Sequence, residues 1–225
     1  TKRVNNLYST FGGSNLNKPI GNWNLTNVKT MRLMLSYNTN FNQDISASVQ
    51  TVGSETYNAW YFPDNTSLQS VLYNAQSFSK PIGNWNISNV TEFQSAFHNN
   101  YLNNSSFATQ NVNLHSGVSY TSWDFSNGTT PITASNMFRF ASIFEGEGLS
   151  TWDVSNMGSM GDAFAQGTNI TTTNYDNILV NWSSSLGINP HSHPNIIHFG
   201  NAKYTGTPGS APSASYAFIE NDLSI

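Results

Sequence analysis

Apolar residues recur along this chain at a spacing of three and then four positions, in groups separated by polar stretches. Two groups span residues 28–35, with Val28, Met31 and Leu35, and residues 90–97. Further groups with this spacing are Val4, Leu7 and Phe11; Met137, Phe140 and Phe144; and Met157, Met160 and Phe164. Such spacing places side chains on one face of a helical turn. We therefore predict a short helical or 3-10 segment in each group.

A second pattern precedes several of these groups. Residues 18–25 (KPIGNWNL) recur almost unchanged as residues 80–87 (KPIGNWNI), and degenerate copies start at Trp123 and Trp152. In each copy a Trp and an apolar residue flank one polar residue, so both apolar side chains face one side of an extended segment. The pattern predicts a short β-strand before each helical group.

Neither the strand nor the helical segment can bury its apolar face alone, so successive units must stack. The predicted fold class is a leucine-rich-repeat-like solenoid with about 25 residues per coil. Each of five to six coils would contain a short parallel β-strand and a helical or 3-10 segment. Residues 1–185 would form this solenoid, and residues 186–225, rich in Pro, Gly and Ser, a non-repeat C-terminal cap and tail.

The repeat breaks at two places. The position three residues after Ile45, where a Trp is expected, is Ser48, and the next Trp of the motif comes late. The excess length predicts one insertion near residues 49–61 and a second near residues 103–119. Loops inserted into a rigid scaffold commonly carry binding residues.

The composition excludes several classes of protein. Charged residues make up 9% of the 225, and the eight Lys and Arg form no basic patch for nucleic-acid phosphates. There is no Cys, so neither disulfides nor thiolate chemistry can occur. Because no apolar run approaches the length of a membrane span, we expect no direct membrane insertion. The chain begins at Thr1 without a Met or a signal sequence, which suggests a processed product or an excised domain.

Three segments together resemble a known repeat: residues 41–46 (FNQDIS), 83–90 (GNWNISNV) and 152–157 (WDVSNM). The combination W-[DN]-x-[ST]-N-V is similar to the BspA-like surface-protein repeat, a leucine-rich-repeat relative of bacterial surface proteins, mycoplasma lipoproteins and some viruses. The resemblance covers most of residues 4–204 and departs from the pattern at Ser48 and in the two insertions. It implies surface exposure and binding, and it supplies neither an enzymatic activity nor a consensus ligand.

Aromatic residues in the first insertion are candidates for partner binding, namely Tyr57, Trp60 and Tyr61. Aromatic side chains are enriched at protein interfaces, and they also fold back over a scaffold, so both interpretations stay open. A second candidate set is the polar residue after each repeat Trp, which should point outward: Asn24, Asn86, Asp124 and Asp153. These residues would form either a solvated polar face or a row that binds sugar hydroxyls or a cation.

Other polar residues favour structural roles. The Asn that ends each repeat motif is expected to bond turn backbone, at positions Asn27, Asn89, Asn127 and Asn156. His191 and His193 could chelate a metal, but two ligands without a carboxylate or Cys nearby favour a surface loop. We accordingly predict no cofactor and no metal.

The sequence therefore predicts a non-catalytic recognition or adhesion module, extracellular and displayed on a cell surface or a virion, that binds a host glycan or protein. The alternative is a structural component of a virion or surface filament that packs against neighbouring copies. A glycan-active enzyme using Asp124 and Asp153 is a third hypothesis, for which no cleft is indicated. No catalytic motif is present in the sequence.

Overall fold

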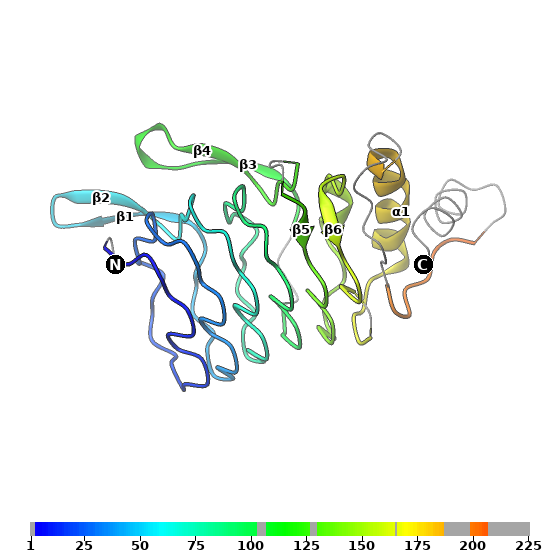
Figure 1. Cartoon of the computed structure of the whole chain (residues 1–225), viewed down its shortest axis with the longest axis horizontal. Coiled ribbons are helices and arrows are strands. Elements are labelled where there is room, and N and C mark those ends of the chain that lie inside the picture. Colours follow the sequence, from blue (N-terminus) through cyan, green and yellow to red (C-terminus); the bar gives the residue numbers. More distant parts are fainter. Residues whose placement is uncertain (1–2, 103–106, 127–129, 165, 187–198, 207–225) are drawn as a thin grey trace.

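The computed structural model describes residues 3–102, 107–126, 130–164, 166–186 and 199–206 (Figure 1). Strands β1 (Ser48–Val52) and β2 (Glu55–Ala59) form an antiparallel hairpin, as do β3 (Gln110–Asn113) and β4 (Ser119–Ser122). The short strands β5 (Ile132–Thr133) and β6 (Met157–Ser159) pair in parallel. The described helices are the 3-10 turns η1 (His115–Gly117) and η2 (Leu149–Thr151), and the α-helix α1 (Thr172–Leu186).

The predicted fold class, a leucine-rich-repeat-like solenoid with a parallel strand and a helical segment in every coil, is wrong. The strands found in the described residues form three separate two-stranded sheets, and two of these are antiparallel hairpins. The strands predicted at residues 23–25 and 85–87 are not formed, and none of the groups with three-then-four spacing is helical. Most of the described chain is instead irregular backbone built from turns.

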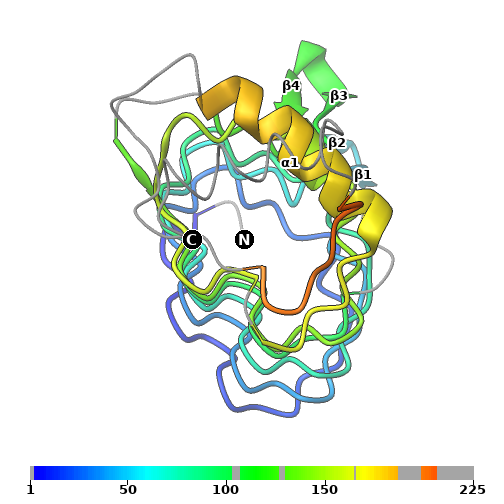
Figure 2. The same ribbon diagram turned by 90° about the vertical axis from the view of Figure 1, so that its right-hand side faces the viewer.

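Segments far apart in sequence lie side by side in this irregular part (Figures 1 and 2). Isolated parallel bridges join Asn6 to Thr30, Thr30 to Ser67, Ser67 to Glu92, and Glu92 to Thr133. A ladder of backbone hydrogen bonds continues from each bridge. We call the stretches that follow the bridges turn segments: residues 7–13, 31–37, 68–74, 93–99 and 134–140.

The turn segments explain why the helix prediction failed. Within residues 31–38, the N–H groups of Met34, Ser36 and Asn38 each donate to the carbonyl three residues earlier. The N–H groups of the odd-numbered residues Leu33, Leu35 and Tyr37 donate to the neighbouring turn segment; Leu33, for example, donates to Gln69 at 2.9 Å. Because alternate N–H groups bond to a neighbour, a helical i to i−4 ladder cannot form. In this segment the chain of turns still buries Met31 and Leu35, the positions that a helix would bury.

Each turn segment contains two residues with positive φ at fixed positions. The first of these positions is occupied by Ser9, Leu33, Ser70, Ser95 and Asn136. The second is occupied by Gly13, Tyr37, Asn74, Asn99 and Phe140. Positive φ is unfavourable for residues other than Gly, so the surrounding hydrogen bonds must hold these residues in place. A turn with positive φ at its third residue has the backbone signature of a type II turn.

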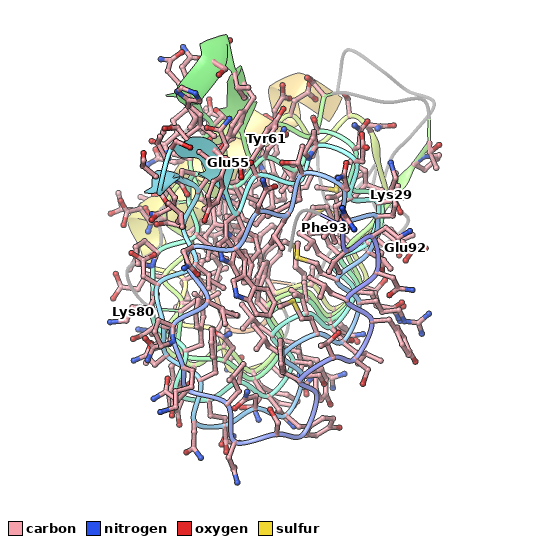
Figure 3. The ribbon with its side chains drawn as sticks, turned by 90° about the vertical axis from the view of Figure 1, so that its left-hand side faces the viewer. Lys29, Glu55, Tyr61, Lys80, Glu92 and Phe93 are labelled. Atoms are coloured by element: carbon pink, nitrogen blue, oxygen red, sulfur yellow. The ribbon has the colours of Figure 1, made fainter. Side chains whose placement is uncertain are left out.

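The interior is filled by aromatic and aliphatic side chains, and five Trp indoles run through it. Each buried indole Nε1 donates to a backbone carbonyl of a preceding segment, as Trp85 does to Ile45 at 2.8 Å. The other four pairs are Trp60 with Ile20, Trp123 with Ile82, Trp152 with Phe107, and Trp182 with Leu149. Figure 3 shows the side chains crowding the interior, with Phe93 pointing inward and its neighbour Glu92 outward.

The sequence pattern placed Phe140 on the inward face of its group, and this prediction is wrong. Its side chain is 41% exposed, whereas Met137 and Phe138 are buried. The inward positions of this turn segment are Ala134, Met137 and Phe138, which match Phe93, Ala96 and Phe97 of the preceding one. The three-then-four spacing of Met137, Phe140 and Phe144 therefore does not mark one face.

One end of the interior is closed by α1. Trp182 and Tyr175 on this helix are buried, and both contact the ring of Phe199. Phe199 also stacks on Phe164, with ring centroids 5.1 Å apart. No helix among the described residues is long and apolar enough to cross a membrane.

Candidate interaction site on the paired hairpins

The two β-hairpins project from the same side of the molecule and lie close to each other (Figure 1). They fall where the sequence pattern is interrupted, β1–β2 within residues 48–59 and β3–β4 within residues 110–122. We call the surface formed by the two hairpins together the hairpin ledge.

Each hairpin returns to the body of the protein in the same way. The Tyr57 hydroxyl donates to the carbonyl of Asn22 at 2.7 Å, and the Tyr120 hydroxyl donates to that of Asn84 at 2.6 Å. Three residues after each Tyr comes a buried Trp with positive φ, 51° at Trp60 and 50° at Trp123. The indole and the hydroxyl thus anchor the base of each hairpin to an earlier segment.

The hairpins are also joined to each other. The side-chain amide of Asn58 on β2 accepts a hydrogen bond from the N–H of His115 at 2.9 Å and donates to its carbonyl at 3.2 Å. His115 begins η1, whose next residue, Ser116, has a φ of 59°. Near the hairpin bases the rings of Tyr61 and Tyr120 stack, with centroids 5.7 Å apart. Two contacts therefore hold the ledge as one unit.

The stacked tyrosines are neutral at ordinary pH. Burial raises the pKa of Tyr120 well above its usual value, and the nearby Tyr61 adds to the shift. The pKa of Tyr61 is also raised, first by burial and then by the charge of Asp64. Ionising either hydroxyl would place a charge in a partly buried contact, so this pair is suited to packing rather than to phenolate chemistry.

The outer surface of the ledge combines exposed aliphatic and polar groups. On β1, Val49 is 47% exposed and Val52 is 60% exposed. Among the described strands β1 pairs only with β2, which leaves its other edge open. On the second hairpin, a shallow hollow of about 330 Å³ is lined by Asn111, Asn113, Ser119, Tyr120 and Thr121.

The structure separates the three aromatic candidates of the first insertion. Trp60 has no exposed surface, and it stacks on Trp85 with centroids 5.8 Å apart. Its proposed role as a contact residue is therefore wrong, because it fills the interior position that the sequence pattern assigned to Ser48. Tyr57 and Tyr61 are half-buried and support the hairpins from below.

The four polar candidates after the repeat Trp positions have a local function. The Oδ1 atom of each accepts a hydrogen bond from the backbone N–H two residues later; at Asp153 the donor is Ser155, at 2.9 Å. The same bond occurs at Asn24, Asn86 and Asp124. This is the Asx-turn geometry that Asn and Asp favour. Asn86 is also buried, so these residues do not form one exposed row.

Two of the repeated Asn residues, Asn89 and Asn156, bond backbone, as a structural role requires. Asn89 donates to the Pro63 carbonyl, and Asn156 donates to that of Thr130. Asn127, His191 and His193 lie outside the described residues. Within the described part of the chain, no group of three or more His, Asp or Glu residues is arranged to hold a metal ion.

The sequence pattern assigns no role to Asn58, Val49 or Val52, which help to define the ledge, and it leaves His115, in the second insertion, open between contact and packing. One available signal was a Tyr-x-x-Trp pattern, which occurs at residues 57–60 and again at residues 120–123. That recurrence marks the point where each insertion returns to the interior. Nothing in the local sequence indicates that Asn58 and His115 meet.

The comparisons with known proteins give a family but no function. A family model described as "Mycoplasma protein of unknown function, DUF285" matches residues 1–110 and 104–186. No curated protein and no solved structure matches the chain. The two matches together span most of the chain, which therefore belongs to the DUF285 family, a family related to the BspA-like repeats.

Proposed function

We propose that this chain is a non-catalytic recognition or adhesion module, displayed on a cell surface or a virion, that binds a host partner through the hairpin ledge. The observation that carries the proposal is the double connection between the hairpins, through Asn58 with His115 and Tyr61 with Tyr120. Joining two projecting hairpins reduces the entropy lost when a partner binds them. A rigid projection suits recognition better than two independent loops would.

The surface chemistry of the ledge favours a protein partner. The open edge of β1 offers unpaired backbone groups to an added strand, a common mode of peptide recognition. Val49 and Val52 supply apolar contact area on the same strand. The hollow on β3–β4 adds amide and hydroxyl groups at the rim. With so few Lys and Arg in the chain, nucleic acid is a poor match for this surface.

The test is binding of the purified chain to arrayed host-cell surface proteins and to a glycan array, with variants confined to the ledge. The double variant Val49→Ser/Val52→Ser removes apolar surface without touching the interior. Ile143→Ser is the matched control, because Ile143 is also an exposed aliphatic residue but lies outside both hairpins. We expect the double variant to weaken binding about tenfold or more and the control to leave it unchanged.

Three outcomes would oppose the proposal. An equal loss of binding affinity in the double variant and in Ile143→Ser would show that the contact surface is not the ledge. Binding only to glycans, insensitive to the valines, would exclude a protein partner at this site. An absence of binding combined with self-association, measured by light scattering, would favour the structural alternative in which copies of the chain pack together.

A further inference from the structure

Four rings from four different turn segments form a continuous column on the surface. Tyr37 contacts Tyr73 with ring centroids 5.1 Å apart, and Tyr73 stacks on His98 at 4.6 Å. His98 then meets the edge of Phe140 at 5.3 Å. The rings at the two ends are the exposed ones, with Tyr37 at 56% and Phe140 at 41%. The column shares no residue with the hairpin ledge.

The column ends at Tyr37 because the adjacent turn segment on that side, residues 7–13, has no side chain at the equivalent position that could add a ring. The turn segment that precedes Tyr37 carries Gly12 and Gly13 at the equivalent positions, and the Gly13 N–H donates to the Ser36 carbonyl at 2.7 Å. A Cβ atom built on Gly13 would meet no atom within 4 Å. The space beside Tyr37, where a further ring would complete the column, is therefore open.

Amide side chains follow closely in sequence on both segments, with Asn15 two residues after Gly13 and Asn40 three residues after Tyr37. Asn40 donates to Asn15 at 3.3 Å, and Gln43 donates to Asn17 at 2.8 Å, both at exposed positions. Asn and Gln side chains each have further donor and acceptor capacity beyond these bonds. Residues 4–17 and 33–43, which flank this place in sequence, carry no Lys, Arg, Asp or Glu. The charged residues of the same turn segments lie elsewhere: Arg32 lies over Tyr8, and Arg139 lies over Phe140 at the far end of the column. The end of the column at Tyr37 is thus flanked by polar and aromatic residues, whereas the arginine that contacts the column does so at its other end, at Phe140.

We propose that the open place beside Tyr37 is a binding subsite for a neutral sugar ring. The ring would lie over Gly13 against the exposed side of Tyr37, continuing the column, and its hydroxyls would bond the amides of Asn15 and Asn40. An apolar ring face with a few convergent polar groups is the usual composition of a small-ligand site. A charged ligand would find no Lys, Arg, Asp or Glu over residues 4–17 and 33–43, whereas the hydroxyls of a neutral sugar match amide donors and acceptors.

The experiment uses the whole chain and a panel of neutral methyl glycosides and disaccharides, observed by saturation-transfer NMR and titration. Tyr37→Asn removes the ring and keeps the backbone, because Asn74 and Asn99 already occupy the equivalent positive-φ position in two other segments. Phe140→Asn is the matched control, since it removes the exposed ring at the other end of the column. A Tyr37→Trp variant retains an aromatic face.

We expect one or more sugars of the panel to bind, with affinity reduced about tenfold or more by Tyr37→Asn and maintained by Tyr37→Trp and Phe140→Asn. Binding of none of the sugars would overturn the proposal. Equal weakening by Tyr37→Asn and Phe140→Asn would also overturn it, because the subsite would then not lie beside Tyr37. Near-UV circular dichroism of each variant verifies that the fold is retained. The valine variants of the ledge should not affect sugar binding, which separates this proposal from that of the protein partner.

Discussion

Replacing Trp60 with Phe tests whether the first insertion ends inside the protein. The indole of Trp60 is fully buried, stacks on Trp85 and donates from Nε1 to the Ile20 carbonyl at 2.8 Å. Trp23 provides the matched control, because its ring is only partly buried and no described residue accepts a hydrogen bond from its Nε1. The two substitutions are chemically identical and differ only in position.

The expected cost follows from two losses. The Ile20 carbonyl keeps a second donor, the N–H of Trp23 at 3.1 Å, so losing the indole bond should cost only about 1 kcal/mol. The smaller Phe ring leaves roughly 40 Å³ unfilled, which at about 24 cal/mol per Å³ adds about 1 kcal/mol. We therefore expect Trp60→Phe to lower the free energy of unfolding by about 2 kcal/mol. Trp23→Phe should cost less than about 1 kcal/mol, because the site is partly exposed and loses no such bond.

Urea unfolding followed by near-UV circular dichroism measures both variants. With a slope of about 2 kcal/mol per M, the midpoint of Trp60→Phe should fall by about 1 M and that of Trp23→Phe by less than half of this. Equal shifts for the two variants would refute the reasoning, as would a neutral Trp60→Phe. Either result would mean that the Trp60 side chain lies at the surface of the insertion and not in the interior.

Three further predictions address the ledge, the Asx turns and the ring column. Asn58→Ala should remove the contact between the hairpins, so that hydrogen exchange of the amides near residues 115–118 accelerates. Asn113→Ala, a change at an exposed position of the second hairpin, should leave this exchange rate unchanged. Asp153→Ala should cost about 1 kcal/mol by removing the Asx turn, whereas Asp153→Asn should be nearly neutral in urea unfolding. Burial, and then the charge of Arg139, lowers the pKa of His98 below 6.5, so the unfolded chain binds this proton more readily. The stability that neutral His98 contributes is fully present above pH 6.5 and falls as the pH drops towards the folded pKa. In His98→Gln the urea midpoint should therefore vary less with pH between about pH 7.5 and 5 than in the unmodified chain. An identical pH profile for His98→Gln and the unmodified chain would contradict this.

The sequence pattern correctly selected many inward positions but not the backbone that presents them. Met31, Leu35, Phe93 and Phe97 are all buried, as the three-then-four spacing predicted. That spacing records only which side chains share a face. A chain of turns with positive φ at Leu33 and its equivalents produces the same face without any helical hydrogen bonds. Because Leu and Ser show no preference for positive φ, their sequence gives no sign of this conformation.

The candidate site was harder to predict because it depends on a contact between two separate insertions. Asn58 and His115 are 57 residues apart, and the contact pairs a side chain with backbone atoms, so no complementary residue types reveal it. Asn58 reaches His115 only because β1–β2 and the η1 turn have particular lengths. Since side chains alternate along a strand, a shift of β2 by one residue would turn Asn58 away from its partner, and a change of length in the second hairpin would displace the His115 backbone. The lengths of the two insertions therefore constrain each other, and local sequence analysis, which treats each insertion separately, cannot detect such a constraint.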